Sequence, residues 1–173
     1  MILKIPMAML ALALGFPAAA RAQDFPFDQF DPTTLSASTH DLETEVAGDG
    51  ASQTIHHKIG DVLVEAPILR RRVEVIYTGQ HREMDAAAIS FYRGYEKAHA
   101  VEDSVADNYR DVYLFREDGV DYWLPVQDQV AAYFSKELKP GQPVQLYLLV
   151  TGGYLRSDGW AWIMPVEEFN AEK

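Results

Sequence analysis

Hydrophobic and polar residues alternate along several short stretches of this chain. The clearest is residues 71–78, where Val73, Val75 and Tyr77 fall on one face and mostly polar residues on the other. Strict alternation over this length is typical of a half-buried β-strand. We expect Pro67 to interrupt the chain before this strand and Gly79 to end it. Further β-prone runs lie at residues 54–66, 111–116, 121–126, 143–151 and 160–166.

Two turn motifs separate neighbouring runs. Asp118 and Gly119 lie between the runs at 111–116 and 121–126, and a central Asp-Gly flanked by β-prone residues is typical of a two-residue hairpin. Ser157-Asp158-Gly159 predicts a second turn. The chain therefore has the turn chemistry of an antiparallel β-protein.

The run at residues 143–151 is the most apolar of the chain. Its even-numbered residues from Val144 to Val150 share one face, while Tyr147 and Leu149 occupy the other. Apolar residues on both faces predict a central or doubly covered strand. In the last run, Trp160, Trp162 and Met164 share a face, and the tail after Val166 is polar.

Helical spacing is found at two places. Residues 127–138 place four apolar residues on one face, with Asp128 as a cap at the start and Pro140-Gly141 as the stop: Val130, Ala131, Phe134 and Leu138. Residues 85–99 favour a helix or mixed insertion, because Asp85 is a plausible N-cap and three alanines follow it. The alternative there is a strand through Ile89, Phe91 and Arg93.

This order of elements predicts a mainly β fold. We expect a small OB-fold-like barrel, closed or partly open, with one helix at about 127–138 and a helical insert at about 85–99. The alternative is an α+β fold, in which an antiparallel sheet carries a packed helix.

The N-terminus resembles a secretory signal peptide. Lys4 provides a positive charge, residues 7–16 are apolar, and Ala20-Arg21-Ala22 has the small residues of a cleavage site. Pro6 and Pro17 argue against the alternative of a buried helix. We therefore predict a signal peptide at residues 1–22, periplasmic or secreted localisation, and no membrane insertion after cleavage.

Residues 23–51 differ from the rest. Residues 23–50 hold seven acidic residues and no Lys or Arg, which predicts a flexible or loosely docked acidic leader. Phe25, Phe27 and Phe30 are the exception, and we expect them to dock onto the body or onto a partner. The remaining residues, 52–173, are expected to form a single globular domain.

Composition narrows the function classes. The chain has no cysteine, which excludes disulfides and thiolate metal sites. A formal charge of −11 disfavours nucleic acid and anionic lipid surfaces as partners. A protein or a small ligand of the cell envelope is the expected partner, and we expect the chain to be a monomer.

No catalytic motif is present. The chain has no G-x-S-x-G sequence, no H-E-x-x-H sequence and no calcium-binding loop motif. His56 and His57 are adjacent, so a strand would point them to opposite faces. We predict no catalytic residue, no metal site and no cofactor, although paired carboxylates are not excluded as acid and base.

Aromatic residues crowd the C-terminal half. On a small barrel such rings serve either as core packing or as platforms for sugars, bases or peptide side chains. Tyr154, Arg156 and Trp160 flank one predicted turn, and we select them as candidate ligand-binding residues.

Three functions follow from these observations. The first is an exported, non-enzymatic binding module of the cell envelope that holds a protein or small ligand on a barrel face. The second is a small hydrolase of an envelope polymer that uses paired carboxylates. The third is a structural or assembly component that docks through the Phe-rich leader.

Overall fold

The computed structural model describes residues 25–47, 54–58, 61–99, 106–157 and 159–171. The signal peptide predicted at residues 1–22 lies outside these ranges. No helix within them is long and apolar enough to cross a membrane.

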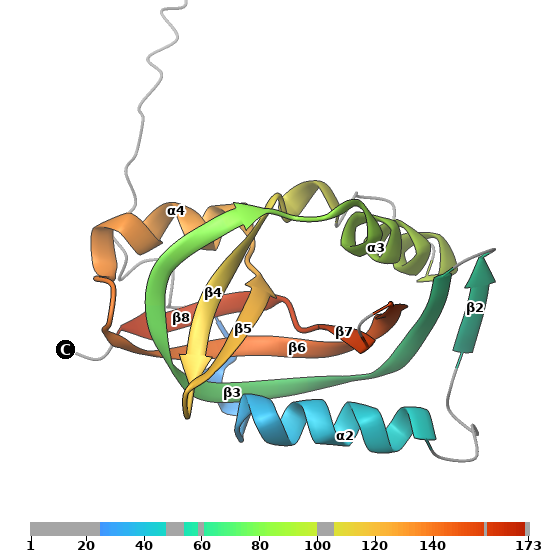
Figure 1. The fold of residues 1–173 in the computed structure, drawn as a ribbon. Helices are drawn as coiled ribbons and strands as arrows, with labels where there is room; N and C mark the ends of the chain where they lie inside the picture. Colours follow the sequence, from blue (N-terminus) through green and yellow to red (C-terminus); the bar gives the residue numbers. More distant parts are fainter. Residues whose placement is uncertain (1–24, 48–53, 59–60, 100–105, 158, 172–173) are drawn as a thin grey trace, which may run out of the picture.

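A strongly curved, mainly antiparallel sheet forms the body of the protein (Figure 1). Its central strand β3 wraps around the molecule and pairs with β4 on one edge and with β6 on the other. Strand β5 extends the sheet beyond β4, and β7 and β8 share the far edge of β6. The bounds are β3 Asp61–Glu83, β4 Asp111–Glu117, β5 Val120–Pro125, β6 Pro143–Arg156, β7 Gly159–Ile163 and β8 Val166–Ala171.

Strand β3 corrects two predicted boundaries. Pro67 does not interrupt it and Gly79 does not end it, since the strand runs continuously from Asp61 to Glu83. Both residues lie instead where the pairing register shifts, between Glu65 and Leu69 toward β6 and between Tyr77 and His81 toward β4. A bulge accommodates such residues and bends the strand, which lets β3 curve around the core.

The predicted hairpin at Asp118-Gly119 is confirmed. Glu117 pairs with Val120, and both turn residues have positive φ, 49° at Asp118 and 83° at Gly119. These angles are those of a type I′ turn, which matches the twist of the two strands it joins.

The prediction for the apolar run at 143–151 is also confirmed, although β6 continues to Arg156. Val144, Leu146, Leu148 and Val150 are fully buried. The last predicted strand, at 160–166, is divided, because β7 ends at Ile163 and β8 begins at Val166 and includes most of the polar tail. Val166 and Phe169 place their side chains in the core from β8, which the acidic residues between them concealed in the sequence.

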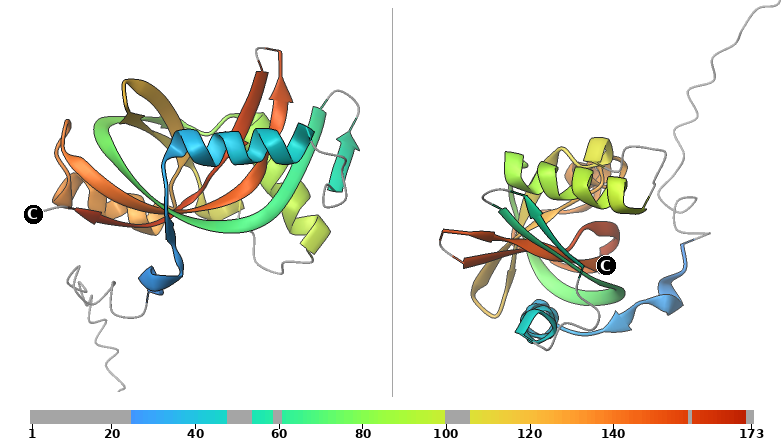
Figure 2. Two further views of the ribbon diagram at one scale, coloured as in Figure 1. Left: turned by 90° about the horizontal axis from the view of Figure 1, so that it is seen from below. Right: turned by 90° about the vertical axis from the view of Figure 1, so that its right-hand side faces the viewer.

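In the described residues, three α-helices cover the sheet. Helices α3 (Ala86–His99) and α4 (Asp128–Glu137) lie on one side, and α2 (Leu35–Ala47) lies on the opposite side (Figures 1 and 2). The helix at 127–138 and the favoured helix at 85–99 are both confirmed, but Asp128 is the first residue of α4 and not its cap. Asp85 caps α3 as expected, since the N–H of Ala88 donates to its Oδ1 at 2.8 Å.

The fold is mainly β, as predicted, but the sheet is not closed. Strands β5 and β7 are the two ends of the path β5-β4-β3-β6-β7. Just beyond the end of β5, Val126 forms an isolated parallel bridge with Val166 of β8, and the N–H of Gln127 donates to the carbonyl oxygen of Val166. Of the two predicted forms, closed or partly open, the sheet has the open one, which also fits the alternative α+β description.

Two groups of buried side chains stabilise the sheet. The main core gathers residues from α2, α4 and most strands around Phe134, whose ring contacts Tyr77, Tyr113, Phe115 and Phe169. A smaller group, the α3 core, lies under α3 and contains Met84, Ala88, Phe91, Tyr92, Ala106, Tyr109, Val112, Tyr154 and Ile163.

The described part of residues 23–51 is packed on the body. It contains α2, whose Leu35 and Leu42 belong to the main core. Glu117 of β4 holds the start of this helix by accepting hydrogen bonds from the N–H groups of Leu35 (2.8 Å) and Ser36 (3.0 Å). For these residues the expectation of a flexible leader is corrected. The division into segments 1–22, 23–51 and 52–173 stays a prediction.

The phenylalanines before α2 dock onto the same chain. The rings of Phe25, Phe27 and Phe30 lie 4.8–5.7 Å from the ring of Tyr147 on β6, between centroids. Short parallel strand β1 (Asp31–Pro32) then pairs with β3, and strand β2 (Thr54–Lys58) adds an antiparallel hairpin to its start.

Candidate ligand-binding groove

A groove of about 460 Å³ lies between β5 and β7, the two end strands of the sheet. Five consecutive residues of β5, 121–125, and four of β7, 160–163, line it. Because neighbouring residues of a strand point to opposite faces, both faces of each strand contribute to the lining. The groove therefore runs between the strand edges, from Thr39 of α2 on one side to Ala88 of α3 on the other.

All three tryptophans of the chain line this groove. Trp160 and Trp162 are stacked, with centroids 5.1 Å apart and planes 11° from parallel. Trp162 packs against the main core and against Gly153, where an added Cβ would lie 2.6 Å from its Cε3. Gly153 thus provides the space for Trp162, and Trp160 is the outer ring of the pair.

On the α3 side the groove is polar. The Tyr154 hydroxyl donates to both oxygens of Asp85, at 3.1 and 3.2 Å, and Nη1 of Arg156 lies 3.7 Å from the same carboxylate. Burial, followed by the charge of Asp85, raises the pKa of Tyr154 to about 12. The hydroxyl therefore stays protonated near neutral pH and acts as a donor.

A second cation faces the groove from the end of β3. The guanidinium carbon of Arg82 lies 4.4 Å from the centre of the Trp123 ring, within the range of a cation–π contact. Asp121, on the β5 edge, is held by Arg116, whose Nε lies 2.6 Å from its Oδ1. This hydrogen bond lowers the pKa of Asp121.

The three candidate residues Tyr154, Arg156 and Trp160 all line this one groove. Sequence reasoning did not select Trp123, Arg82 and Asp85, which lie there too. The sequence did offer a signal for Asp85. It is a predicted helix N-cap that follows a β-prone segment, so its side chain is expected at a strand–helix junction. Arg82 and Trp123 had no such signal, because the pairing of β3 with β4 and of β4 with β5 brings them together.

A second cavity, of about 640 Å³, lies between α3, α4 and β4. Four acidic residues and two arginines are among its thirteen lining residues, including Arg110 and Asp128, which form an ion pair, and Asp111, which lies 3.8 Å from Nδ1 of His81. It has no tryptophan, and Arg110 already pairs with one of its carboxylates. We therefore regard the groove between β5 and β7 as the better candidate site.

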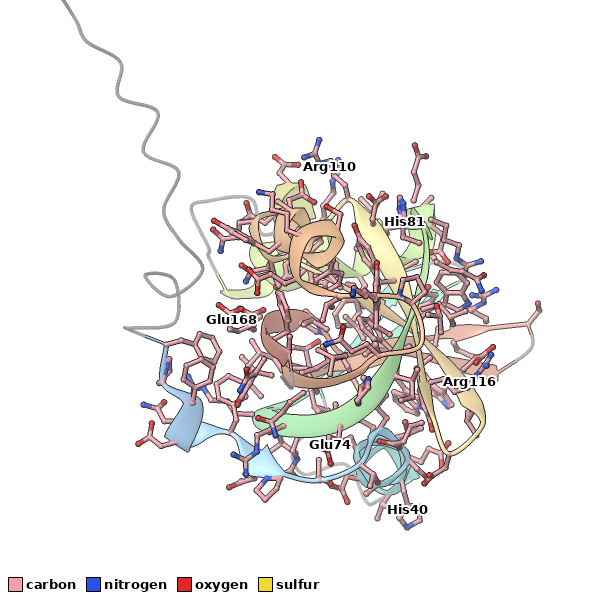
Figure 3. The ribbon with its side chains drawn as sticks, turned by 90° about the vertical axis from the view of Figure 1, so that its left-hand side faces the viewer. His40, Glu74, His81, Arg110, Arg116 and Glu168 are labelled. Atoms are coloured by element: carbon pink, nitrogen blue, oxygen red, sulfur yellow. The ribbon has the colours of Figure 1, made fainter. Side chains whose placement is uncertain are left out.

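Metal-ligating residues do not converge in the described ranges, where no group of three His, Asp or Glu side chains is positioned to hold an ion. Figure 3 shows His40 on α2 and His81 at opposite ends of the molecule. The side chains of His56 and His57 fall outside the described part of the structure.

A buried polar cluster lies beneath α3 and α4. The Tyr109 hydroxyl donates to Glu167, and Nε2 of Gln127 donates to the other oxygen of this carboxylate at 2.6 Å. Burial raises the pKa of Glu167. Glu167 lines neither cavity, so we do not assign it to a candidate site.

Comparison of this chain with protein-family models, with curated proteins and with solved structures found no match.

Proposed function

We propose that this protein is an exported, non-enzymatic binding module of the cell envelope, and that its ligand occupies the groove between β5 and β7. The observation that carries the proposal is the placement of the aromatic residues. All three tryptophans, with Tyr154, Arg82 and Arg156, meet at the one place where the sheet is open.

The composition of the groove suits recognition. Pockets for small ligands have volumes of about 300–1,000 Å³ and combine apolar walls with a few placed polar groups. This groove has the volume, the stacked pair Trp160 and Trp162, and the polar group around Asp85.

The binding test uses protein expressed from the full-length sequence and the envelope fraction of the source organism. Trp160→Ala and Arg156→Ala are expected to weaken binding about tenfold each, as truncation of central aromatic and arginine contacts does. Ile76→Ala is the control, because this residue of β3 is 38% exposed and does not line the groove. Equal binding by all four proteins, or no binding by any, would refute the proposal.

Export is tested separately by fractionation and N-terminal sequencing of the same protein. We expect the protein outside the cytoplasm with Gln23 as its first residue. Recovery of the uncleaved chain in the cytoplasm would contradict the envelope location without affecting the groove.

A further inference from the structure

We propose that the occupant of the groove is an extended peptide segment of a partner protein, which adds to the sheet as a strand between the edges of β5 and β7. This inference rests on the proposed function and deepens it, because it specifies the chemistry of the ligand. It is derived from the backbone of the two strands as well as from the side chains.

The two hairpin turns determine which backbone groups face the groove. Val120 is paired with Glu117 across a two-residue turn, so the backbone groups of Val120, Tyr122 and Leu124 point toward β4. Those of Asp121 and Trp123 then point away from β4, into the groove. Val126 follows Val120 by an even number of residues, so its backbone groups should also point toward β4. Its N–H donates to the carbonyl oxygen of Asp111, which agrees with this alternation.

The same reasoning applies to β7. Gly159 pairs with Arg156 across a two-residue connection, so Gly159, Ala161 and Ile163 direct their backbone groups toward β6. Trp160 and Trp162 direct theirs into the groove. Among the described residues, no backbone–backbone hydrogen bond occupies this edge of either strand.

The chain just beyond β5 already pairs with another strand on this side. Like Trp123, Gln127 directs its backbone groups away from β4, and its N–H donates to the carbonyl oxygen of Val166 of β8 at 3.3 Å. Among the described residues, this bond and the Val126–Val166 bridge close one end of the gap. Strands β5 and β7 run parallel to each other, since each is related to β3 through antiparallel pairs. A single inserted strand can therefore pair with both edges.

The side chains around the gap predict the pattern of the peptide. On the α2 side an inserted residue meets Trp160 and Trp162, which favours an aliphatic or aromatic side chain. On the α3 side it meets Arg82 and Arg156. Asp85 lies 3.7 Å from Arg156 and Asp121 is held by Arg116, so three guanidinium groups accompany two carboxylates there. Acidic side chains suit that face, because carboxylates pair well with guanidinium groups. Since a strand alternates between faces, the peptide should alternate apolar and acidic residues.

The experiment titrates the full-length expressed protein with the peptide Thr-Glu-Val-Glu-Phe-Glu-Val. A second peptide has the same composition with the alternation removed, and a third has the first sequence with every second backbone nitrogen methylated. Binding is followed by tryptophan emission, which reports on the groove because all three tryptophans line it. Hydrogen exchange of β5 and β7 amides reports on main-chain pairing.

We expect the alternating peptide to bind and to slow amide exchange in both strands. Loss of alternation and backbone methylation should each weaken binding about tenfold or more. Arg82→Ala and Trp160→Ala should weaken it similarly, and Ile76→Ala should not.

Three outcomes would overturn strand addition. These are equal binding of the methylated peptide, absence of binding by the alternating peptide, and an uncharged oligosaccharide such as cellohexaose shifting the tryptophan emission in place of the peptides. Each leaves the proposed function standing if binding to the envelope fraction still depends on Trp160 and Arg156. If that dependence is absent too, both proposals fail.

Discussion

The gap beside β5 has a closed end, where Val126 meets Val166 of β8, and an open end, where β5 faces β7 across the groove. Both ends contain aromatic residues, but the surroundings of these residues differ. At the closed end, Val126 bridges to Val166, and Phe134 and Phe169 pack together at 5.0 Å between centroids. At the open end the three tryptophan rings are half-buried, and charged or hydroxyl groups lie beside them. The first arrangement hides apolar surface, while the second leaves it for another molecule.

This difference shows that aromatic content alone does not distinguish a core from a binding site. Phe134 is 1% exposed and its contacts are other rings. Trp123 is partly exposed and carries Arg82 over its face. Stability should therefore depend on the closed end and recognition on the open end, and the following substitutions test that separation.

The largest effect on stability is expected for Phe134→Ala. Removal of a buried phenylalanine ring leaves a cavity and costs about 3–5 kcal/mol of unfolding free energy. Urea denaturation measures the change. Where the variant is still folded, its affinity for the envelope fraction should equal that of the wild type. A tenfold loss of affinity under conditions in which the variant is fully folded would show that the closed end also contributes to binding.

The next effect is expected for Glu117→Ala, which removes the acceptor for two N–H groups at the start of α2. Unsatisfied donors in a buried position cost about 1–3 kcal/mol. Glu117→Gln keeps one acceptor oxygen and should cost less, chiefly the charge interaction with the helix terminus. Denaturation curves that coincide for the alanine variant and the wild type would show that Glu117 does not hold α2.

A smaller change in stability, within about 1 kcal/mol, is expected for Trp160→Ala, because the outer ring of the stacked pair belongs to neither core. The same variant should lose about tenfold in affinity. Denaturation and binding are measured on one preparation. A loss of stability comparable to that of Phe134→Ala would place Trp160 in the core and remove the basis for the proposed site.

The smallest effect is a pH dependence at the closed end. Burial raises the pKa of Glu167 above 4.5, so the folded protein holds this proton more tightly than the unfolded chain does. The resulting stability is fully present below pH 4.5 and is lost as the pH rises through the pKa of the folded state. The free energy of unfolding of Glu167→Gln, minus that of the wild type, should therefore increase from pH 4.5 upward.

Asp121→Asn is the control with the opposite sign. Arg116 lowers the pKa of Asp121 below 3.8, so the difference between this variant and the wild type should fall as the pH rises toward 3.8 and stay constant above it. A flat profile for Glu167→Gln would mean that its carboxylate is hydrated in solution.

Local patterns predicted most of the individual elements. The Asp118-Gly119 turn, helix α4 and the apolar face of β6 depend on neighbouring residues, so the sequence was sufficient for them. Helix α2 was missed because its apolar residues, Leu35 and Leu42, are few, and because its anchor Glu117 is 82 positions away from Leu35. Thr34, which accepts a hydrogen bond from the N–H of Ala37 at 3.0 Å, was the one local sign of a helix start.

The sequence by itself determined the mainly β character, the two confirmed helices and the clustering of Tyr154, Arg156 and Trp160 around one turn, because these follow from periodicity and short-range turn chemistry. Only the tertiary structure decided that the sheet stays open, that Arg82 lies over Trp123, and that the edges of β5 and β7 face the same groove. These features depend on the curvature of β3 and on pairings between distant strands, which no local pattern encodes.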